Sequence, residues 1–137
     1  MLRVTCDTNV LISASIVQGK QYEILRIAKM GEIKLILSPD IIEEFKEVIS
    51  RPRFSFSQEQ VANAVQQILD LAEIVIPQEK LDIIIEDEED NKVLECALEG
   101  KVQYIISGDS HLLSLKSYEN IEIVNATSFL DIFNKIG

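Results

Sequence analysis

Short apolar runs alternate with longer amphipathic segments along the whole chain. The runs are rich in β-branched residues, as buried strands are. They predict strands over residues 3–6, 33–37, 73–76, 104–107 and 121–124. The amphipathic segments repeat their apolar positions every three to four residues, which is the helical period. They predict helices over residues 9–17, 22–30, 40–50, 57–71, 90–99, 110–115 and 127–135.

Local signals mark the ends of several predicted helices. Pro39 stands at an early helical position, where proline is favoured. Ser57 and Gln60 have the spacing of a capping box. We expect Gly31 and Gly100 to end the helices that precede them, because glycine favours that position. The segment 51–53, Arg-Pro-Arg, is expected to be a break in helical structure.

The alternation of strands and helices predicts the fold class. Apolar strands that are bounded by helices are typical of a parallel sheet covered on both faces. We therefore expect an α/β fold, a three-layer α/β/α sandwich with a mostly parallel central sheet. The 137 residues contain no linker, repeat or low-complexity segment, so residues 1–137 are expected to form a single domain.

Composition and charge narrow the class of protein. A hydrophobic content of 47% with 26% charged residues is typical of a globular chain, and no apolar stretch approaches the roughly 20 residues of a membrane span. No secretion signal is recognisable, and Cys6 and Cys96 are expected to be reduced core thiols in a cytoplasmic protein. The net charge of −10 argues against nucleic-acid binding driven by charge alone. Two explanations of the excess of acidic residues stay open: they keep the protein soluble, or some of them hold a metal ion.

Two acids follow predicted strands. Asp7 comes directly after the strand 3–6, and Asp109 follows the strand 104–107 after one glycine. In an open parallel sheet the ligand crevice lies beyond the carboxyl ends of the strands. Each aspartate is therefore placed for a shared site, although each could also be only the N-cap of the next helix.

A third acid lies on the helix predicted over residues 40–50. At about 100° per residue, the apolar face is centred on Ile41, Phe45 and Val48. Glu44 falls at the border of this face, whereas Glu43 and Glu47 fall on the opposite side. Glu44 can thus reach over the sheet edge or be an ordinary boundary residue.

A fourth acid lies in the acidic run over residues 86–90. Projected back from the helix over 90–99, Asp90 falls near the centre of the buried face, while Glu88 and Glu89 fall away from it. Asp87 suits a helix cap. A first-turn acid that served only the helix dipole would be better placed on the solvent side, so Asp90 is a candidate for the site.

Four acids from separate segments are therefore expected in one region: Asp7, Glu44, Asp90 and Asp109. Like charges within ~4–6 Å repel one another unless some take up protons or a cation intervenes. Oxygen ligands suit hard divalent cations, so Mg²⁺ or Mn²⁺ is the expected cofactor. His111 is the only histidine, and a zinc site of histidines and cysteines is not indicated.

These residues lie in segments that resemble a known family. CDTNVLISA, LSPDIIEEFKEVI, EDEEDNKVLECALEGKVQYIISGDSHLL and NATSFLDIF occur in the order of the successive blocks of PIN-domain ribonucleases. The resemblance covers nearly the whole chain. It is strongest to VapC-like prokaryotic members, the toxin components of toxin–antitoxin pairs. The block from Asp90 to Leu113 is the most specific part.

The resemblance implies a function and a set of roles. It implies a Mg²⁺- or Mn²⁺-dependent endoribonuclease that hydrolyses RNA phosphodiesters and has a protein antitoxin as partner. By resemblance the catalytic, metal-binding acids are Asp7, Glu44, Asp90 and Asp109, and the polar residues that hold them in place are Thr8, Asn9 and Ser107. Many relatives carry a further acid where this chain has His111. The resemblance therefore supports one metal site and leaves a second open, with His111 as a weak ligand, a phosphate contact or a surface residue.

Other features leave alternatives open. Candidates for contacts with RNA are Lys20, Arg51, Arg53 and His111, each of which could equally be a solvated surface residue. The apolar positions of the helices 22–30 and 59–72 could support a homodimer or only the core. The rival classes are a catalytically inactive PIN-like binding module and a phospho-receiver domain. A phospho-receiver domain would need a second acid paired with Asp7 and a lysine after the strand 104–107. This chain has Thr5-Cys6 before Asp7 and no such lysine.

Overall fold

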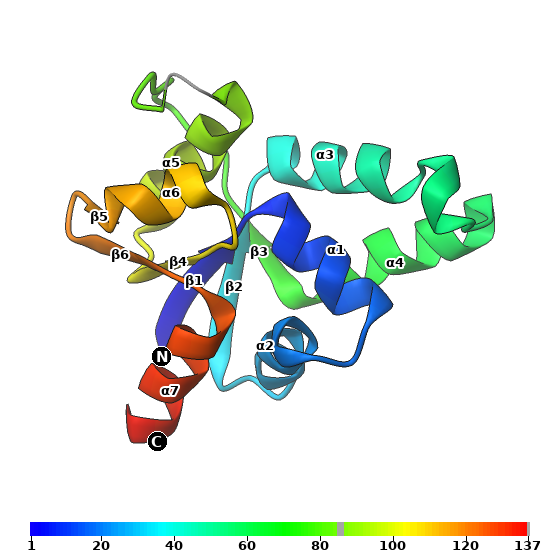
Figure 1. The fold of residues 1–137 in the computed structure, drawn as a ribbon, viewed down its shortest axis with the longest axis horizontal. Coiled ribbons are helices and arrows are strands. Elements are labelled where there is room, and N and C mark those ends of the chain that lie inside the picture. Colours follow the sequence, from blue (N-terminus) through cyan, green and yellow to red (C-terminus); the bar gives the residue numbers. More distant parts are fainter. Residues whose placement is uncertain (85–86, 137) are drawn as a thin grey trace.

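The computed structural model describes residues 1–84 and 87–136, and it confirms the predicted fold class (Figure 1). Glu86, where the predicted acidic run begins, and Gly137 lie outside the described residues. The described residues form a six-stranded sheet with the order β3-β2-β1-β4-β6-β5. Its strands are β1 (Leu2–Cys6), β2 (Ile33–Leu37), β3 (Ala72–Ile74), β4 (Tyr104–Ile106), β5 (Ser117–Tyr118) and β6 (Ile121–Val124).

Helices cover both faces of the sheet. They are α1 (Thr8–Ile16), α2 (Lys20–Lys29), α3 (Pro39–Ile49), α4 (Gln58–Leu71), α5 (Glu88–Gly100), α6 (Ser110–Leu115) and α7 (Ala126–Ile136), with a short 3₁₀ helix, η1 (Pro52–Phe54). Figure 1 shows α5 and α6 above the sheet and α2 and α7 below it. Helix α5 packs on β1 and β2, whereas α2 packs on β2 and α7 on β4. Two helical layers with a sheet between them are the predicted three-layer sandwich.

The pairing of the strands is parallel except at one edge. Strands β1, β2, β3, β4 and β6 pair in parallel, and β5 alone pairs antiparallel to β6. The sequence analysis missed β5, because two residues carry no periodic signal. The strand predicted over 73–76 is observed at Ala72–Ile74, and the predicted break at 51–53 contains η1.

Gly31 and Gly100 stand at helix ends for different structural reasons. Gly31 has φ +79°, a left-handed conformation that suits a residue after a helix end. Gly100 is the last residue of α5, at the predicted helix end, and the left-handed residue is the next one, Lys101, with φ 53°. A Cβ at position 100 would come within 2.5 Å of Cγ2 of Ile36. Glycine at position 100 thus lets α5 pack closely on β2.

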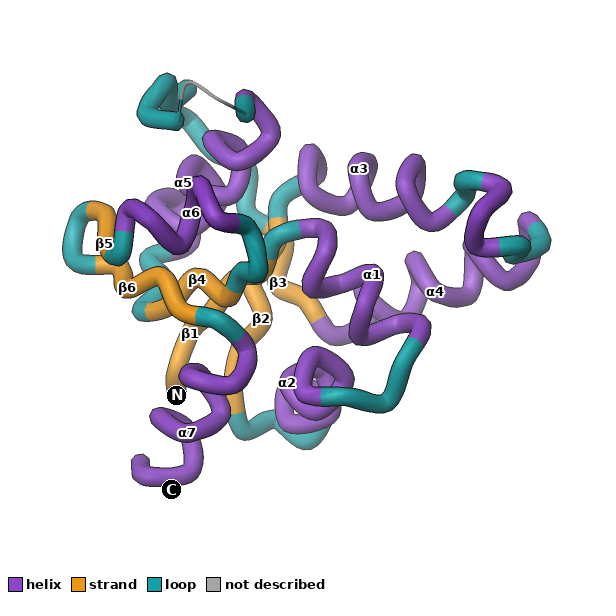
Figure 2. The backbone as a smooth tube through the Cα atoms, in the orientation of Figure 1, coloured by secondary structure: helices purple, strands orange, loops and turns teal. Residues whose placement is uncertain are grey.

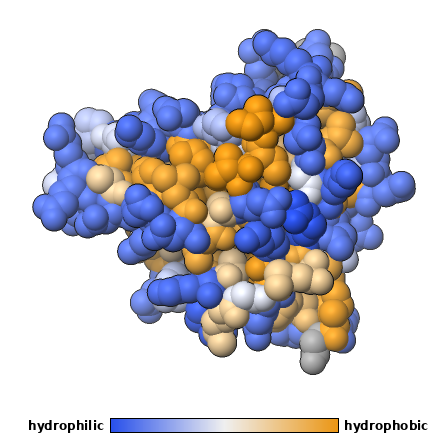
Figure 3. Space-filling view, turned by 180° about the vertical axis from the view of Figure 1, so that it is seen from behind, coloured by the Kyte–Doolittle hydropathy of each residue, from blue (hydrophilic) through white to orange (hydrophobic). Residues whose placement is uncertain are grey.

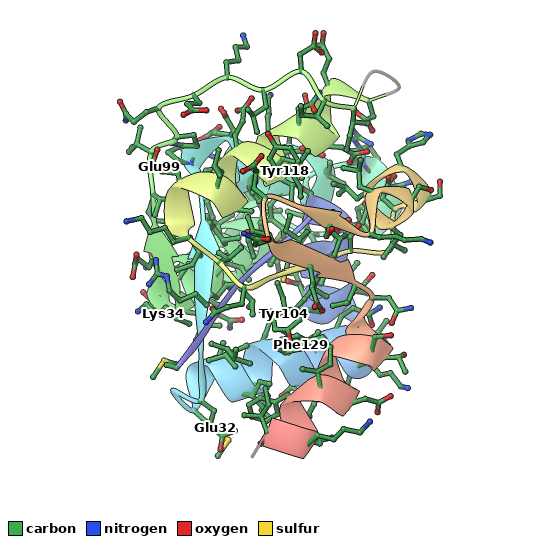
Figure 4. All side chains as sticks on the ribbon, turned by 90° about the vertical axis from the view of Figure 1, so that its left-hand side faces the viewer. Glu32, Lys34, Glu99, Tyr104, Tyr118 and Phe129 are labelled. Carbon is green, nitrogen blue, oxygen red and sulfur yellow. The ribbon has the colours of Figure 1, made fainter. Side chains whose placement is uncertain are left out.

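The core fixes the strand ends from which the candidate site is built. Val4, Leu35, Ile105 and their neighbours on the central strands are fully buried. In Figure 4, Tyr104 of β4 and Phe129 of α7 point toward one another, with ring centroids 5.7 Å apart in an edge-to-face arrangement. Cysteines 6 and 96 are both free and buried, as predicted. None of the helices in the described part of the chain is long and apolar enough to cross a membrane.

Candidate metal centre

The register of β1 and β4 places Asp7 beside Ser107. Cys6 pairs with Ile106, so the residues that follow them leave the sheet side by side at its carboxyl edge. The Asp7 backbone N–H donates to the Ile106 carbonyl over 3.2 Å. The Ser107 hydroxyl donates to Oδ2 of Asp7 and accepts the backbone N–H of Asp109 at 2.9 Å. Ser107 therefore links the two aspartates, and its role in holding them for a metal stays a prediction.

Three of the aspartates cap helices, as the simpler reading of the sequence allowed. Oδ1 of Asp7 accepts the backbone N–H of Val10 at 3.0 Å, and Oδ1 of Asp109 accepts that of His111 at 2.8 Å. Oδ1 of Asp87 accepts the backbone N–H of Glu89 at 2.9 Å. Each of these bonds uses Oδ1 of the carboxylate. Capping orients the side chain and still leaves oxygen lone pairs for a cation, so the two readings are compatible.

Asp90 has a different environment. It lies in the first turn of α5 with only 7% of its surface exposed, on the buried face as predicted. Its Oδ2 atom is buried and has no hydrogen-bond partner among the described residues. Burial, Asp109, Asp87 and Asp7 raise the pKa of Asp90 to about 8. A buried oxygen without a partner costs free energy, which a bound cation would relieve.

Two glutamates, Glu44 and Glu89, lie close to each other near these aspartates. Glu44 of α3 is half-buried, as its border position predicts, and Glu43 and Glu47 are exposed. Burial and the neighbouring Glu89 carboxyl raise the pKa of Glu44 to about 7, against an opposing effect of the Thr8 hydroxyl. The pKa of Glu89 is lowered by its hydrogen bond with Glu44. Their proximity therefore favours a protonated Glu44 beside a charged Glu89.

A small pocket joins these groups. Figure 2 shows that the loops after β1, β2 and β4 leave the sheet on the same side, where α1, α3 and α6 begin. The pocket has a volume of about 50 Å³ and is lined by Asp7, Thr8, Asn9, Glu44, Asp87, Glu89, Asp90, Val93 and Asp109. A bound water needs roughly 10–15 Å³ of such volume. The pocket therefore has room for an ion with a few waters and not for a nucleotide.

Three of the remaining predicted site residues, Thr8, Asn9 and His111, lie in or near the pocket. Thr8 is buried in the pocket wall, and Asn9 lines the pocket as an exposed residue. No side-chain hydrogen bond from Asn9 to a carboxylate occurs among the described residues, so its orienting role stays a prediction. The Nδ1 atom of His111 lies near Asp90 and Asp109, at 3.9 and 3.8 Å from one oxygen of each.

The three predicted basic contacts lie outside this pocket. Lys20 is exposed at the start of α2, beyond the end of α1. Arg51 forms an ion pair with Glu47 at 2.9 Å, and the Arg53 guanidinium lies 4.7 Å from the ring centre of Phe54. Their roles in RNA binding stay predictions.

The sequence analysis missed two contributors. Glu89 was assigned to the outward face of α5, and it is exposed, yet it lines the pocket because the pocket opens at the rim of the sheet. Asn91 is buried, and its amide binds the backbone of Ile83 and Ile84. It therefore ties the backbone of residues 83 and 84 to the start of α5.

The donor set fits a hard divalent cation. Carboxylate oxygens from Asp7, Asp90 and Asp109 face one pocket, and Oδ2 of Asp90 lacks any other partner among the described residues. Oxygens of Asp90 and Asp109 and Nδ1 of His111 lie within 4.8 Å of one another. Because carboxylates dominate the pocket, Mg²⁺ and Mn²⁺ are the cations that these residues suit.

Comparison with known proteins identifies the family. A model of the PIN domain matches residues 3–111, so the chain belongs to the PIN-domain family, as the motifs indicated. All four candidate acids lie within the matched residues. No curated protein matches the sequence at a significant level. Membership in this family removes the support for a phospho-receiver domain.

Two solved structures share the fold at low sequence identity. One is VapBC2 from Rickettsia felis bound to a DNA fragment from their promoter, with a TM-score of 0.64, 16% identity, and coverage of 90% of this chain and 98% of that chain. The other is PAE2754 from Pyrobaculum aerophilum, with a TM-score of 0.65, 10% identity, and coverage of 98% of this chain and 90% of that chain. These likenesses agree with the fold that the strand order and the helical layers define.

Proposed function

We propose that residues 1–137 form a single Mg²⁺- or Mn²⁺-dependent endoribonuclease domain, the cytoplasmic toxin component of a toxin–antitoxin pair. The observation that carries this proposal is the convergence of Asp7, Asp90 and Asp109 on one pocket with a buried, unpartnered Asp90 oxygen. Membership in the PIN-domain family supports the nuclease class. The free buried thiols fit a reducing compartment.

The residues of the pocket suit phosphodiester hydrolysis. A bound divalent cation would stabilise charge on the phosphodiester and lower the pKa of a water molecule. Asp7, Asp90 and Asp109 would hold that cation, while the capping bonds and Ser107 fix the two strand-end carboxylates. Glu44, the fourth acid of the predicted metal-binding set, lines the same pocket together with Glu89. The raised pKa of Glu44 also suits a group that orients water or exchanges a proton. The pocket is too small for a base, so the RNA backbone must approach from outside in a single-stranded form.

The test is cleavage of a mixed RNA pool by the purified protein with Mn²⁺, Mg²⁺ or EDTA. We expect cleavage with either cation and none in EDTA. Asp90→Asn should lower the rate at least about 100-fold without changing the circular-dichroism spectrum, a loss typical of removing a catalytic group. Glu43→Gln on the exposed side of α3 is the matched control and should cleave normally. Equal rates in wild type and Asp90→Asn would refute the assignment.

An antitoxin partner is supported by the surface. Figure 3 shows an apolar band on the face seen from behind, where α4 and β3 lie. Leu69 of α4, Ile74 of β3 and the following Ile76 are exposed, and a groove of about 520 Å³ lies between α3 and α4. Exposed apolar surface of this kind is typical of protein interfaces. We expect the product of a neighbouring reading frame to co-purify with this chain and to inhibit cleavage.

A substitution tests that interface. Ile76→Glu should weaken the complex at least tenfold and leave RNA cleavage unchanged, because Ile76 is exposed and does not line the acidic pocket. Ile136→Glu is the control, since it changes an equally exposed residue on a different element, α7. Equal affinity in both variants would place the antitoxin on another surface.

The same purified protein also tests two alternatives, an inactive binding module and a homodimer. A catalytically inactive binding module would bind RNA or protein and show no cation-dependent cleavage. A homodimer would show twice the monomer mass in light scattering. On α2 and α4, Ile24, Ile27 and Ile68 are buried in the core, so the core accounts for most of the apolar pattern, while Tyr22 and Leu69 stay exposed.

A further inference from the structure

The single histidine of the chain projects toward the acidic pocket. His111 lies in the first turn of α6, directly after the cap formed by Asp109. Its Nδ1 atom is 3.9 Å from Oδ2 of Asp90 and 3.8 Å from Oδ1 of Asp109. Hydrogen bonds between nitrogen and oxygen have lengths of about 2.7–3.2 Å, so neither contact is a hydrogen bond. The imidazole nitrogen instead stands nearly equidistant from two carboxylate oxygens.

The three atoms are close enough together for one ion to contact all of them. Cations of this size hold oxygen and nitrogen ligands at about 2.0–2.2 Å. Two ligands of an octahedral ion are then about 3.0 Å apart when adjacent and about 4.2 Å apart when opposite. The distances from Nδ1 to the two oxygens, 3.9 and 3.8 Å, exceed the adjacent value by about 1 Å, and all three atoms lie within 4.8 Å of one another. Small side-chain movements would therefore bring the three atoms into adjacent positions around one ion.

An independent observation points to a ligand at this place. The oxygen of Asp90 that lies nearest to the imidazole is the buried atom without a hydrogen-bond partner among the described residues. Only 7% of the Asp90 surface is exposed, so water satisfies this oxygen poorly. A cation between Asp90, Asp109 and His111 would satisfy it and leave the exposed side of the imidazole in solvent.

We propose that Nδ1 of His111 is a direct ligand of the cation held by Asp90 and Asp109, and that it makes this site selective for Mn²⁺ and similar transition-metal ions over Mg²⁺. The inference rests on the proposed metal-dependent function and adds a ligand and a preference to it. Imidazole nitrogen suits transition-metal ions, whereas Mg²⁺ is held mainly by oxygen ligands and water. The third ligand therefore adds more affinity for Mn²⁺ than for Mg²⁺.

The alternative is that a protonated imidazole pairs electrostatically with the two acids and leaves when a cation binds. The two arrangements differ in a spectroscopic observable. A ligating imidazole gives a nitrogen coupling to bound Mn²⁺ in pulsed electron paramagnetic resonance, and an electrostatic pair gives none. Because the chain contains one histidine, a coupling in the untagged protein can come only from His111.

The experiment combines this spectrum with calorimetric affinities for Mn²⁺ and Mg²⁺ in wild type, His111→Ala and His111→Asp. Wild type should show the imidazole coupling. His111→Ala should lose the coupling and at least tenfold in Mn²⁺ affinity, but less than about threefold in Mg²⁺ affinity. His111→Asp should raise Mg²⁺ affinity relative to Mn²⁺. Ser110→Ala, at the exposed neighbouring position, is the control and should match wild type in both measurements.

The outcomes separate this inference from the proposed function. Mn²⁺ binding without an imidazole coupling, or with unchanged affinity in His111→Ala, overturns the role of His111 and leaves the acidic metal site intact. Absence of Mn²⁺ binding in wild type overturns both. Loss of Mn²⁺ and Mg²⁺ affinity by the same factor in His111→Ala overturns the selectivity and leaves His111 as a ligand if the coupling is present.

Discussion

Replacing Asp90 by Asn should stabilise the protein when no cation is present. The pKa of Asp90 is raised to about 8 in the folded protein by burial and by neighbouring acids, whereas an unfolded aspartate titrates near 3.9. The unfolded chain therefore releases this proton near pH 4, and the folded chain keeps it until about pH 8. Over this range the unfolded state binds fewer protons, so the wild type loses stability as the pH rises. Asn cannot titrate and does not suffer this loss.

The size of the effect follows from the pKa. Each pKa unit corresponds to about 1.4 kcal/mol. Converting the whole pKa shift into free energy of unfolding would give several kcal/mol at neutral pH. The expected gain is smaller, because the mouth of the pocket is open to solvent and because the amide of Asn still leaves a buried polar group without a partner. We expect Asp90→Asn to raise the free energy of unfolding in EDTA by about 1–3 kcal/mol at pH 7.5 and by much less at pH 4.

The assay is urea unfolding of wild type and Asp90→Asn between pH 4 and pH 8, in EDTA and again in Mn²⁺. The advantage of the variant should grow with pH in EDTA. Mn²⁺ at a hundred times its Kd should stabilise the wild type by about 2.7 kcal/mol and the variant far less, which reverses the order. A variant that is less stable than wild type in EDTA at pH 7.5, or a difference that does not depend on pH, would refute the reasoning.

Two further predictions concern packing around the site. Gly100→Ala should destabilise the protein by about 1–3 kcal/mol in urea unfolding, because the new Cβ would lie 2.5 Å from Cγ2 of Ile36, while Gly108→Ala, with no atom within 4 Å, should be nearly neutral. Asn91→Ala should cost about 2–4 kcal/mol and speed hydrogen exchange at Ile83 and Ile84, since it removes the acceptor of the part-buried Ile83 N–H and of the buried Ile84 N–H. Equal stability of the two glycine variants, or unchanged exchange in Asn91→Ala, would contradict these accounts.

Much of the fold followed from the sequence because its signals are local. The helical period located Glu44 and Asp90 on their helices correctly, and the capping box of Ser57 and Gln60 is present. The packing role of Gly100 was missed because the sequence shows a glycine at a helix end but not the strand that approaches it. The strand β5 escaped prediction because its pairing with β6 is set by tertiary structure.

The candidate site shows the same division. The strand-end positions of Asp7 and Asp109 were visible in the sequence, and the register of β1 and β4 then brings them together through Ser107. Glu89 was missed because a helical wheel separates buried from exposed positions and does not show a pocket at the sheet rim. The direction of the His111 side chain depends on the short helix α6 and could not be derived from spacing alone.

The central claim is that acids from separate segments form one divalent-cation site. The most direct test is a crystal structure with Mn²⁺, with the ion located by its anomalous scattering. We predict a peak in the pocket between Asp7, Asp90 and Asp109, at about 2.0–2.4 Å from Oδ2 of Asp90. The account would be contradicted if this position stayed empty in crystals that contain millimolar Mn²⁺ and the carboxyl groups of Asp90 and Asp109 contacted each other directly through a shared proton.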